Sequence, residues 1–397
     1  MKKILFLLLL IFCILFFLGR PSGEAIGKSF TENNDIEEEL DNTINQQLDE
    51  IDWDTFQSFL EEHAEENYGL FNGSIFSTTK DILSGNFSTD ATSFLQYLLN
   101  IFLVKLENLF PVLTGIAVIC ILSGVIGKTR SNLLNESTGN LINFFFFSTV
   151  LLLLLTGVWD LYNIAKEAIY SIKGLSNISM PILITLMTAT GAKVSSKVYT
   201  PAVALLSEGV TEIVSGVVLP MFVFCVVFCI ISNLSQEIKL HQLANFFKKV
   251  SSWILGITFT VFTGFLAIQG LTAATIDGVS IRAAKFATKA YIPILGGYLA
   301  DGFDLILTSC VLIKNSFGVV GLLIVLSIVL SPIIHIIVFN IGLNIVTALT
   351  EPIADKSIVG FLVDICKSLS ILLASVLAVT FMLFLLIMMM IFSANVF

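Results

Sequence analysis

The sequence predicts an all-α, polytopic membrane protein with six to eight spans, an N-terminal signal-like segment and an acidic, helical extracytoplasmic region. Of its 397 residues, 56% are hydrophobic and only 13% are charged, whereas soluble domains carry about 25% charged residues. Several apolar runs also reach the roughly 20 residues that a helix needs to cross a bilayer. Runs such as Phe144–Phe147 do not alternate in polarity, as the strands of a membrane barrel would.

The first element in the chain is a signal-like segment, residues 1–25. Lys2 and Lys3 precede an apolar run from Ile4 to Leu18, which is the pattern of a secretory signal. Two outcomes stay open, cleavage near Gly23–Ala25 or retention as an N-terminal anchor. Either outcome predicts that the residues after this segment are extracytoplasmic.

Residues 26–100 form the predicted acidic, helical extracytoplasmic segment. Residues 21–90 hold 17 acidic and 2 basic side chains, a net charge of −15, while residues 91–397 have a net charge of +3. The negative net charge of the chain therefore comes from this segment, and the rest of the chain is slightly basic. No basic, aromatic-rich stretch suggests nucleic-acid binding.

Two helices are predicted within the acidic segment. Apolar side chains recur every three or four residues from Ile36 to Ile51, the period of one helix face. Asp52 or Asp54 is placed to cap a second helix, whose apolar side chains are Trp53, Phe56, Phe59 and Leu60. The segment is either a solvated arm or a docking surface for a partner or the membrane face.

Residues 101–397 form the predicted multi-span membrane domain. The candidate spans are 109–126, 141–158, 175–192, 209–232, 250–268, 292–313, 317–340 and 369–392. The third and sixth are doubtful because both carry polar side chains. If the N-terminal segment is outside and all eight runs cross, the basic residues weakly favour that orientation. The cluster Lys239, Lys248 and Lys249 opposes it.

A polar segment from Ala267 to Asp304 interrupts the apolar runs. Polar groups at membrane depth are costly unless paired or hydrated, so they are candidates for function. The candidate residues for a polar path or a partner contact are Gln269, Asp277, Arg282, Lys285, Lys289, Asp301 and Asp304. Within this segment Asp277 and Gly278 predict a turn or a helix start.

The three cations of the segment share one helix face. Arg282, Lys285 and Lys289 are separated by three and four residues, which is the spacing of helical neighbours. They predict a basic amphipathic helix. One hypothesis is a cytoplasmic interface helix that binds anionic lipid headgroups. The other is the wall of a conduit or a contact for a cytoplasmic partner.

Asp301 and Asp304 are three residues apart and also share a face. We expect them to pair with Lys314 or the basic helix, or to line water. The alternative is that the two carboxylates form a binding site for a proton or an ion.

No catalytic, cofactor-binding or metal-binding residues are predicted, and the chain is not expected to be an enzyme. The histidines are His63, His241 and His335, and none belongs to a zinc-protease pattern. The sequence contains no phosphate loop and no Gly-x-Ser-x-Gly elbow. The cysteines lie mostly in apolar runs, where thiols act as small apolar side chains.

The central motifs resemble one family, stage III sporulation protein AE. The matching residues are Gln269-Gly270, Ala273-Ala274, Asp277-Gly278, Arg282, Ala284-Lys285-Phe286, Ile292-Pro293, Leu295-Gly296 and Lys314-Asn315 with Gly318 and Gly321. A second match is the polar loop from Gln236 to Leu243. The N-terminal part is similar in character alone.

The resemblance implies a place in an endospore-forming bacterium. It implies a non-enzymatic subunit of the mother cell-to-forespore channel, a secretion-like complex in the mother-cell-derived outer forespore membrane. The expected partners are other stage III subunits, including a cytoplasmic ATPase and intermembrane ring proteins, together with membrane lipids and further copies of the chain. The subunit would be the conduit or the export platform. The alternatives are a stand-alone secondary transporter and a purely structural membrane scaffold.

Overall fold

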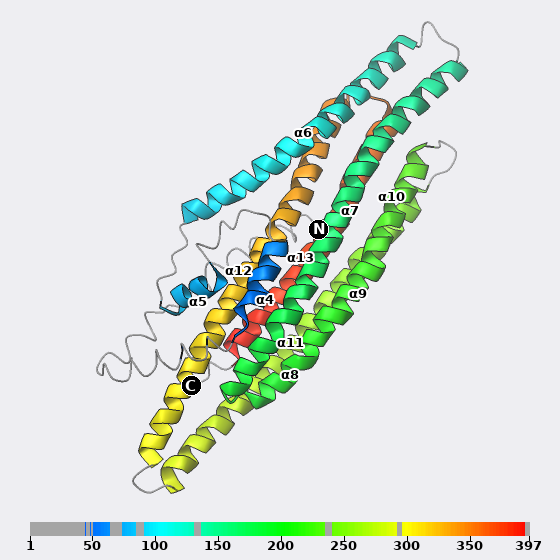
Figure 1. The fold of residues 1–397 in the computed structure, drawn as a ribbon. Coiled ribbons are helices and arrows are strands. Elements are labelled where there is room, and N and C mark those ends of the chain that lie inside the picture. The colour runs from blue at the N-terminus through cyan, green and yellow to red at the C-terminus, as the bar shows by residue number, and fades with distance from the viewer. Residues whose placement is uncertain are drawn as a thin grey trace.

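A computed structural model describes residues 44, 48, 51–63, 74–84, 91–130, 136–234, 240–291 and 296–393. Every regular element in these ranges is a helix (Figure 1). The elements are α4 (Trp53–His63), α5 (Ile75–Leu83), α6 (Ala91–Arg130), α7 (Glu136–Ala189), α8 (Lys193–Ala204), η1 (Leu205–Val210), α9 (Thr211–Ile213), η2 (Val214–Val218), α10 (Leu219–Leu234), α11 (His241–Tyr291), α12 (Gly296–Thr350) and α13 (Lys356–Phe392). The signal-like segment, like most of the chain before Ile51, lies outside the described residues.

Six helical segments of the described chain are long and apolar enough to cross a membrane. They confirm the all-α multi-span prediction at the lower end of its range. Two predicted boundaries between spans are absent, because 141–158 and 175–192 both lie in α7, and 292–313 and 317–340 overlap the single helix α12. At 1.5 Å per residue, α7 and α12 are about 80 Å long, against a hydrocarbon core of about 30 Å.

The third membrane-length segment runs from α8 to α10 through two π-helical stretches, η1 and η2. Pro220 lies just after η2 and has no N–H to donate to the carbonyl of residue 216. A wider turn at this point keeps the helix continuous. Pro181 and Pro332 likewise lie inside α7 and α12 without ending them, which membrane helices tolerate.

Helices α12 and α13 form the centre of the bundle (Figure 1). Over their most apolar stretches, 72% of α12 and 61% of α13 is buried, against 22% of α7 and of α11. Both helices bury large apolar side chains, among them Phe339 and Leu343 of α12 and Leu372 and Leu383 of α13. The outer helices α6, α7 and α11 instead expose leucine, phenylalanine and tryptophan to the bilayer.

The bundle has two ends, which we name by their connections. The loop end holds the last turns of α6, α10 and α12 and the first turns of α7, α11 and α13, and the hairpin end holds the α7–α8 turn, the last turn of α11 and the first turn of α12 (Figure 1). Six crossings put the basic part of α11 at the same end as the start of α6. The eight-span prediction placed that basic helix on the opposite, cytoplasmic side from the N-terminal segment, and the merged helices correct this.

Helices α4 and α5 both pack on α12, and α4 also packs on α7. Phe56 is 5.1 Å from Phe317 of α12, measured between ring centroids, and Phe59 closes over Gly174 of α7. Phe56, Phe59 and Leu60 are buried, as the helical spacing indicated. The apolar stripe of α4 therefore meets the helices of its own chain.

The start of α4 also follows the sequence prediction. Asp52 caps the helix: its carboxylate accepts hydrogen bonds from the Thr55 amide at 3.2 Å and the Thr55 hydroxyl at 2.6 Å. These bonds hold the pKa of Asp52 below its ordinary value. A carboxylate at this position satisfies an N–H group that has no partner within the helix.

Candidate functional site

Asp277 is more buried than Asp304, the other acid of the polar segment whose side chain is described. It does not begin a turn, because it lies inside the continuous helix α11. Its two oxygens accept hydrogen bonds from the amides of Val194, at 2.9 Å, and Ser195, at 2.7 Å. These amides open α8, directly after the turn at Gly191, which has a φ of +80°.

Asp277 therefore caps a different helix from its own. The first N–H groups of a helix have no partner inside it, and a negative charge there also complements the helix dipole. Capping by a residue on α11 joins α8 to α11 at the hairpin end. This contact explains the charge at Asp277 without a role in transport.

The basic face of α11 lies opposite an acid of α12. Lys285 forms an ion pair with Asp304 across the α11–α12 hairpin, which agrees with the expectation that the aspartates pair with the basic helix. Arg282 is exposed. Gln269 and Lys289 lie on α11 and Asp301 on α12, and their side chains are outside the part of the structure that is described.

The motif residues Lys314 and Gly318 hold the end of α13 against α12. The Lys314 side chain is fully buried, and its Nζ donates to the carbonyl of Ile391 at 2.8 Å. A Cβ at Gly318 would overlap the side chain of Ile391. Because the last carbonyls of a helix lack partners within it, this hydrogen bond satisfies one of them.

Helix α8 holds the same end of α13 from the other side. The Tyr199 hydroxyl donates to the Met389 carbonyl at 3.3 Å. A Cβ at Gly270 would stand 2.8 Å from that hydroxyl, so a larger residue on α11 would displace it. Several residues that carry the family resemblance, namely Gly270, Asp277, Lys314 and Gly318, therefore lie where one helix packs against or bonds to another.

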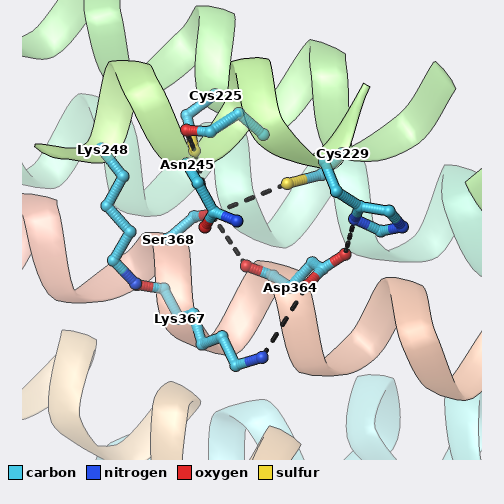
Figure 2. A pocket seen from close by; sticks show the side chains of 9 residues that line it. Cys225, Cys229, Asn245, Lys248, Asp364, Lys367 and Ser368 are labelled. Atoms are coloured by element: carbon cyan, nitrogen blue, oxygen red, sulfur yellow. Dashed lines mark hydrogen bonds and ion pairs between the residues drawn. The ribbon is translucent and has the colours of Figure 1, made fainter. Parts of the chain in front are cut away.

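A second polar cluster lies near the loop end and was not among the predicted site residues. Figure 2 shows it between α10, α11 and α13. The side chains around it are Cys225, Cys229, His241, Asn245, Lys248, Asp364, Lys367 and Ser368.

Asp364 links the three helices of this cluster. Its carboxylate lies 3.0 Å from Nδ1 of His241 and accepts a hydrogen bond from the Asn233 amide at 3.1 Å. The Lys248 ammonium donates to the carbonyl of Lys367. These contacts join the last turn of α10 and the first turns of α11 to α13.

The thiols of this cluster face a hydroxyl rather than a base. Cys225 Sγ is 3.3 Å from the hydroxyl oxygen of Ser368, and Cys229 Sγ is 3.9 Å from it. His241 pairs with Asp364 rather than with either thiol. The cluster is therefore not the thiol-and-base pair of cysteine catalysis. The pocket between these side chains has a volume of about 10 Å³, which leaves room for at most one water and none for a substrate.

The described residues hold no group of three or more acidic, histidine or cysteine side chains placed to bind a metal. Two sequence signals could have pointed to the cluster. Cys225 and Cys229 are four residues apart, and so are Asp364 and Ser368, so each pair shares a helix face. The contact between the two cysteines and Ser368 joins residues more than 130 positions apart in the chain. The spacing of residues within one helix does not predict such a contact.

A further polar contact joins η1 to α7. Glu208 lies in η1, inside a continuous helical segment, where its carboxylate accepts a hydrogen bond from Lys173 of α7 at 2.8 Å.

These contacts and six membrane-length helices define a multi-pass α-helical membrane protein in which Asp277, Lys314 and Asp364 each join one helix to another. Residues 74–394 match the family model described as stage III sporulation protein AE. The match covers the entire bundle, so the chain belongs to the stage III sporulation protein AE family. It is similar to the stage III sporulation protein AE of Bacillus subtilis (strain 168), with 25% identity over 100% of this chain and 98% of that protein. No solved structure matches it.

Proposed function

We propose that this chain is a non-enzymatic membrane subunit of the channel between mother cell and forespore, located in the outer forespore membrane. Its family is one of sporulation proteins. The observation that carries the proposal is the extent of the family match, which covers all six membrane-length helices. The channel role that the resemblance implies therefore concerns the entire bundle.

Within this complex the chain acts as a platform rather than as a pore through one copy. Between α12 and α13 the described interior is mostly apolar, and the polar side chains that cross it bond to backbone: Lys314 donates to the Ile391 carbonyl, and Asn340 donates to the Cys366 carbonyl at 2.9 Å. The buried hydroxyls there donate within their own helices: Ser327 to Leu323 at 3.0 Å, and Ser375 to Ile371 at 2.8 Å. A water-filled path needs polar groups that face it. Any conduit would therefore run between copies or between this chain and another subunit.

The loop end faces the mother-cell cytoplasm in this proposal, and the hairpin end faces the intermembrane space. Of the cluster Lys239, Lys248 and Lys249, the described members Lys248 and Lys249 lie near the loop end, in the first turns of α11. With six crossings this cluster joins the inside residues, which agrees with the positive-inside rule. The ATPase would then approach the loop end, and ring proteins the hairpin end.

Purification of the tagged chain from sporulating cells tests the proposal. We expect the ATPase and the ring proteins to co-purify in a fixed ratio, with few copies of this chain. A chain that purifies alone, and that supports sporulation in cells without these partners, would support the stand-alone transporter. A large ring of identical copies would overturn the platform role in favour of a conduit between copies.

The transporter alternative assigns coupling to Asp301 and Asp304. Because Asp304 is already paired with Lys285, we expect its replacement to loosen the hairpin. The double variant Asp301→Asn, Asp304→Asn should stay in the membrane with its partners. Complete loss of sporulation with unchanged assembly would instead support a path through these residues.

A further inference from the structure

We infer that the tip of the α11–α12 hairpin is a docking surface for an extracytoplasmic protein whose apolar surface is edged by carboxylates. The tip comprises α11 from Arg282 to Tyr291 and α12 from Gly296 to Ile306. The inference rests on the proposed function for the identity of the partner and for the side of the membrane. The surface itself rests on the geometry and exposure of the hairpin.

The tip extends beyond the end of the central helix α13. That end is marked on α12 by Gly318, which packs on Ile391. Ile306 is 12 residues and Gly296 is 22 residues before Gly318. At 1.5 Å per residue, the tip lies about 18 to 33 Å beyond the end of α13. Figure 1 shows the hairpin projecting past the neighbouring helices.

The charged helices α4 and α5 show where the hydrocarbon core ends. They pack at the level of Phe317, beside Gly318. Their outer faces expose charges to the surroundings: Asp52, Asp54, Glu61, Glu62, Lys80 and Asp81. Exposed charges are costly in the hydrocarbon core, so the core ends on the loop side of this level.

The tip is consequently in water rather than in lipid. The polar layer outside the hydrocarbon core is only about 5–8 Å thick on each side. The tip begins about 18 Å beyond Gly318. An apolar surface at this distance is not explained by contact with acyl chains.

Large apolar side chains are nevertheless exposed on the tip. Phe286 of α11 is 74% exposed, and Phe303 and Ile306 of α12 are each 49% exposed. On a water-facing surface, clustered apolar side chains mark a site for a protein partner. Aromatic and arginine side chains are also enriched in protein interfaces.

The charges of the tip whose side chains are described indicate the chemistry of that partner. Lys285 and Asp304 pair with each other and tie the two helices together, while Arg282 is exposed. A carboxylate on the partner would complement Arg282 through two parallel hydrogen bonds. A second copy of the chain would bring a second Arg282 and repulsion, so a different protein fits better.

Photo-crosslinking in the full chain tests this inference in sporulating cells. A benzophenone amino acid replaces Phe286 in one strain. In the control strain it replaces Trp253, which is 72% exposed on the membrane-spanning part of α11. We expect position 286 to form an adduct with an intermembrane ring protein and position 253 to form adducts with lipid. Lipid adducts alone at 286, or adducts with another copy of this chain, would overturn the inference.

A charge reversal tests the recognition. Arg282→Glu should reduce the adduct at position 286 about tenfold, because the change removes the cation and places a negative charge against the partner's carboxylate. Lys197→Glu reverses an exposed cation of α8 at the same end and should leave it unchanged. Equal adduct yields for the two variants would overturn the assigned chemistry.

If ring proteins still co-purify but position 286 forms no adduct with them, the docking surface is wrong and the proposed function stands. If co-purification is lost in the unmodified chain, the proposed function fails.

Discussion

Replacing Asp277 with alanine should open the start of α8. The carboxylate is only 4% exposed and accepts hydrogen bonds from the amides of Val194 and Ser195. A hydrogen bond to a charged group contributes about 1.5–3 kcal/mol, and loss of a whole N-cap side chain costs about 0.5–2 kcal/mol. For a buried cap with two bonds we expect about 3 kcal/mol. This free energy corresponds to roughly 100-fold in the equilibrium of local opening.

Hydrogen exchange measured by mass spectrometry on the detergent-purified full chain reads this change directly. Peptides covering residues 190–200 should exchange about 100-fold faster in the Asp277→Ala variant where exchange follows local opening. Asp277→Asn keeps one acceptor oxygen and should have a smaller effect. Asp160→Ala removes an exposed carboxylate of α7 and serves as the control. Unchanged exchange at the start of α8 in a folded Asp277→Ala protein would refute the capping role.

Three further changes test the packing and the N-terminal helices. Gly318→Ala should lower thermal stability by about 1–3 kcal/mol through overpacking, whereas Gly256→Ala should not, because its Cβ would meet nothing within 4 Å; equal melting temperatures would contradict this packing. Phe56→Ala should release α4 from the bundle at a cost of about 3–5 kcal/mol, seen as faster exchange over residues 53–63, and unaltered exchange would show that α4 is held elsewhere. The pKa of Asp52 is lowered from 3.8 by its bonds to Thr55. Its contribution should therefore be complete above about pH 4 and disappear as the pH falls through the lower, folded pKa. Hydrogen exchange over α4 should rise at low pH in the unmodified chain but not in Asp52→Ala. The same rise in both proteins would argue against the cap.

Local features of the fold were predictable where neighbours in the chain determine them. The Asp52 cap joins residues three apart, and the apolar face of α4 repeats at helical spacing. The pairing of Asp304 with the basic helix was also expected, because one short connection joins the two helices.

Other local signals were misleading because distant contacts override them. Asp277 precedes a glycine, a pattern typical of turns, yet α11 continues through it and its carboxylate caps α8. Polar side chains around residue 177 suggested a weak third span, yet α7 is one helix that packs against α12 and α13. Merging these spans changed which end of the bundle the basic helix occupies.

The sequence by itself determined the class of the protein, because the free energy of placing apolar residues in lipid accumulates residue by residue along each run. The tertiary structure decided what the polar residues do. Its decisive contacts join residues far apart in the chain: Lys314 and Ile391, Asp277 and Val194, Asn233 and Asp364, and Tyr199 and Met389 are separated by 77, 83, 131 and 190 residues. Such pairings depend on how whole helices lie against one another, and the spacing of residues along one helix carries no record of them.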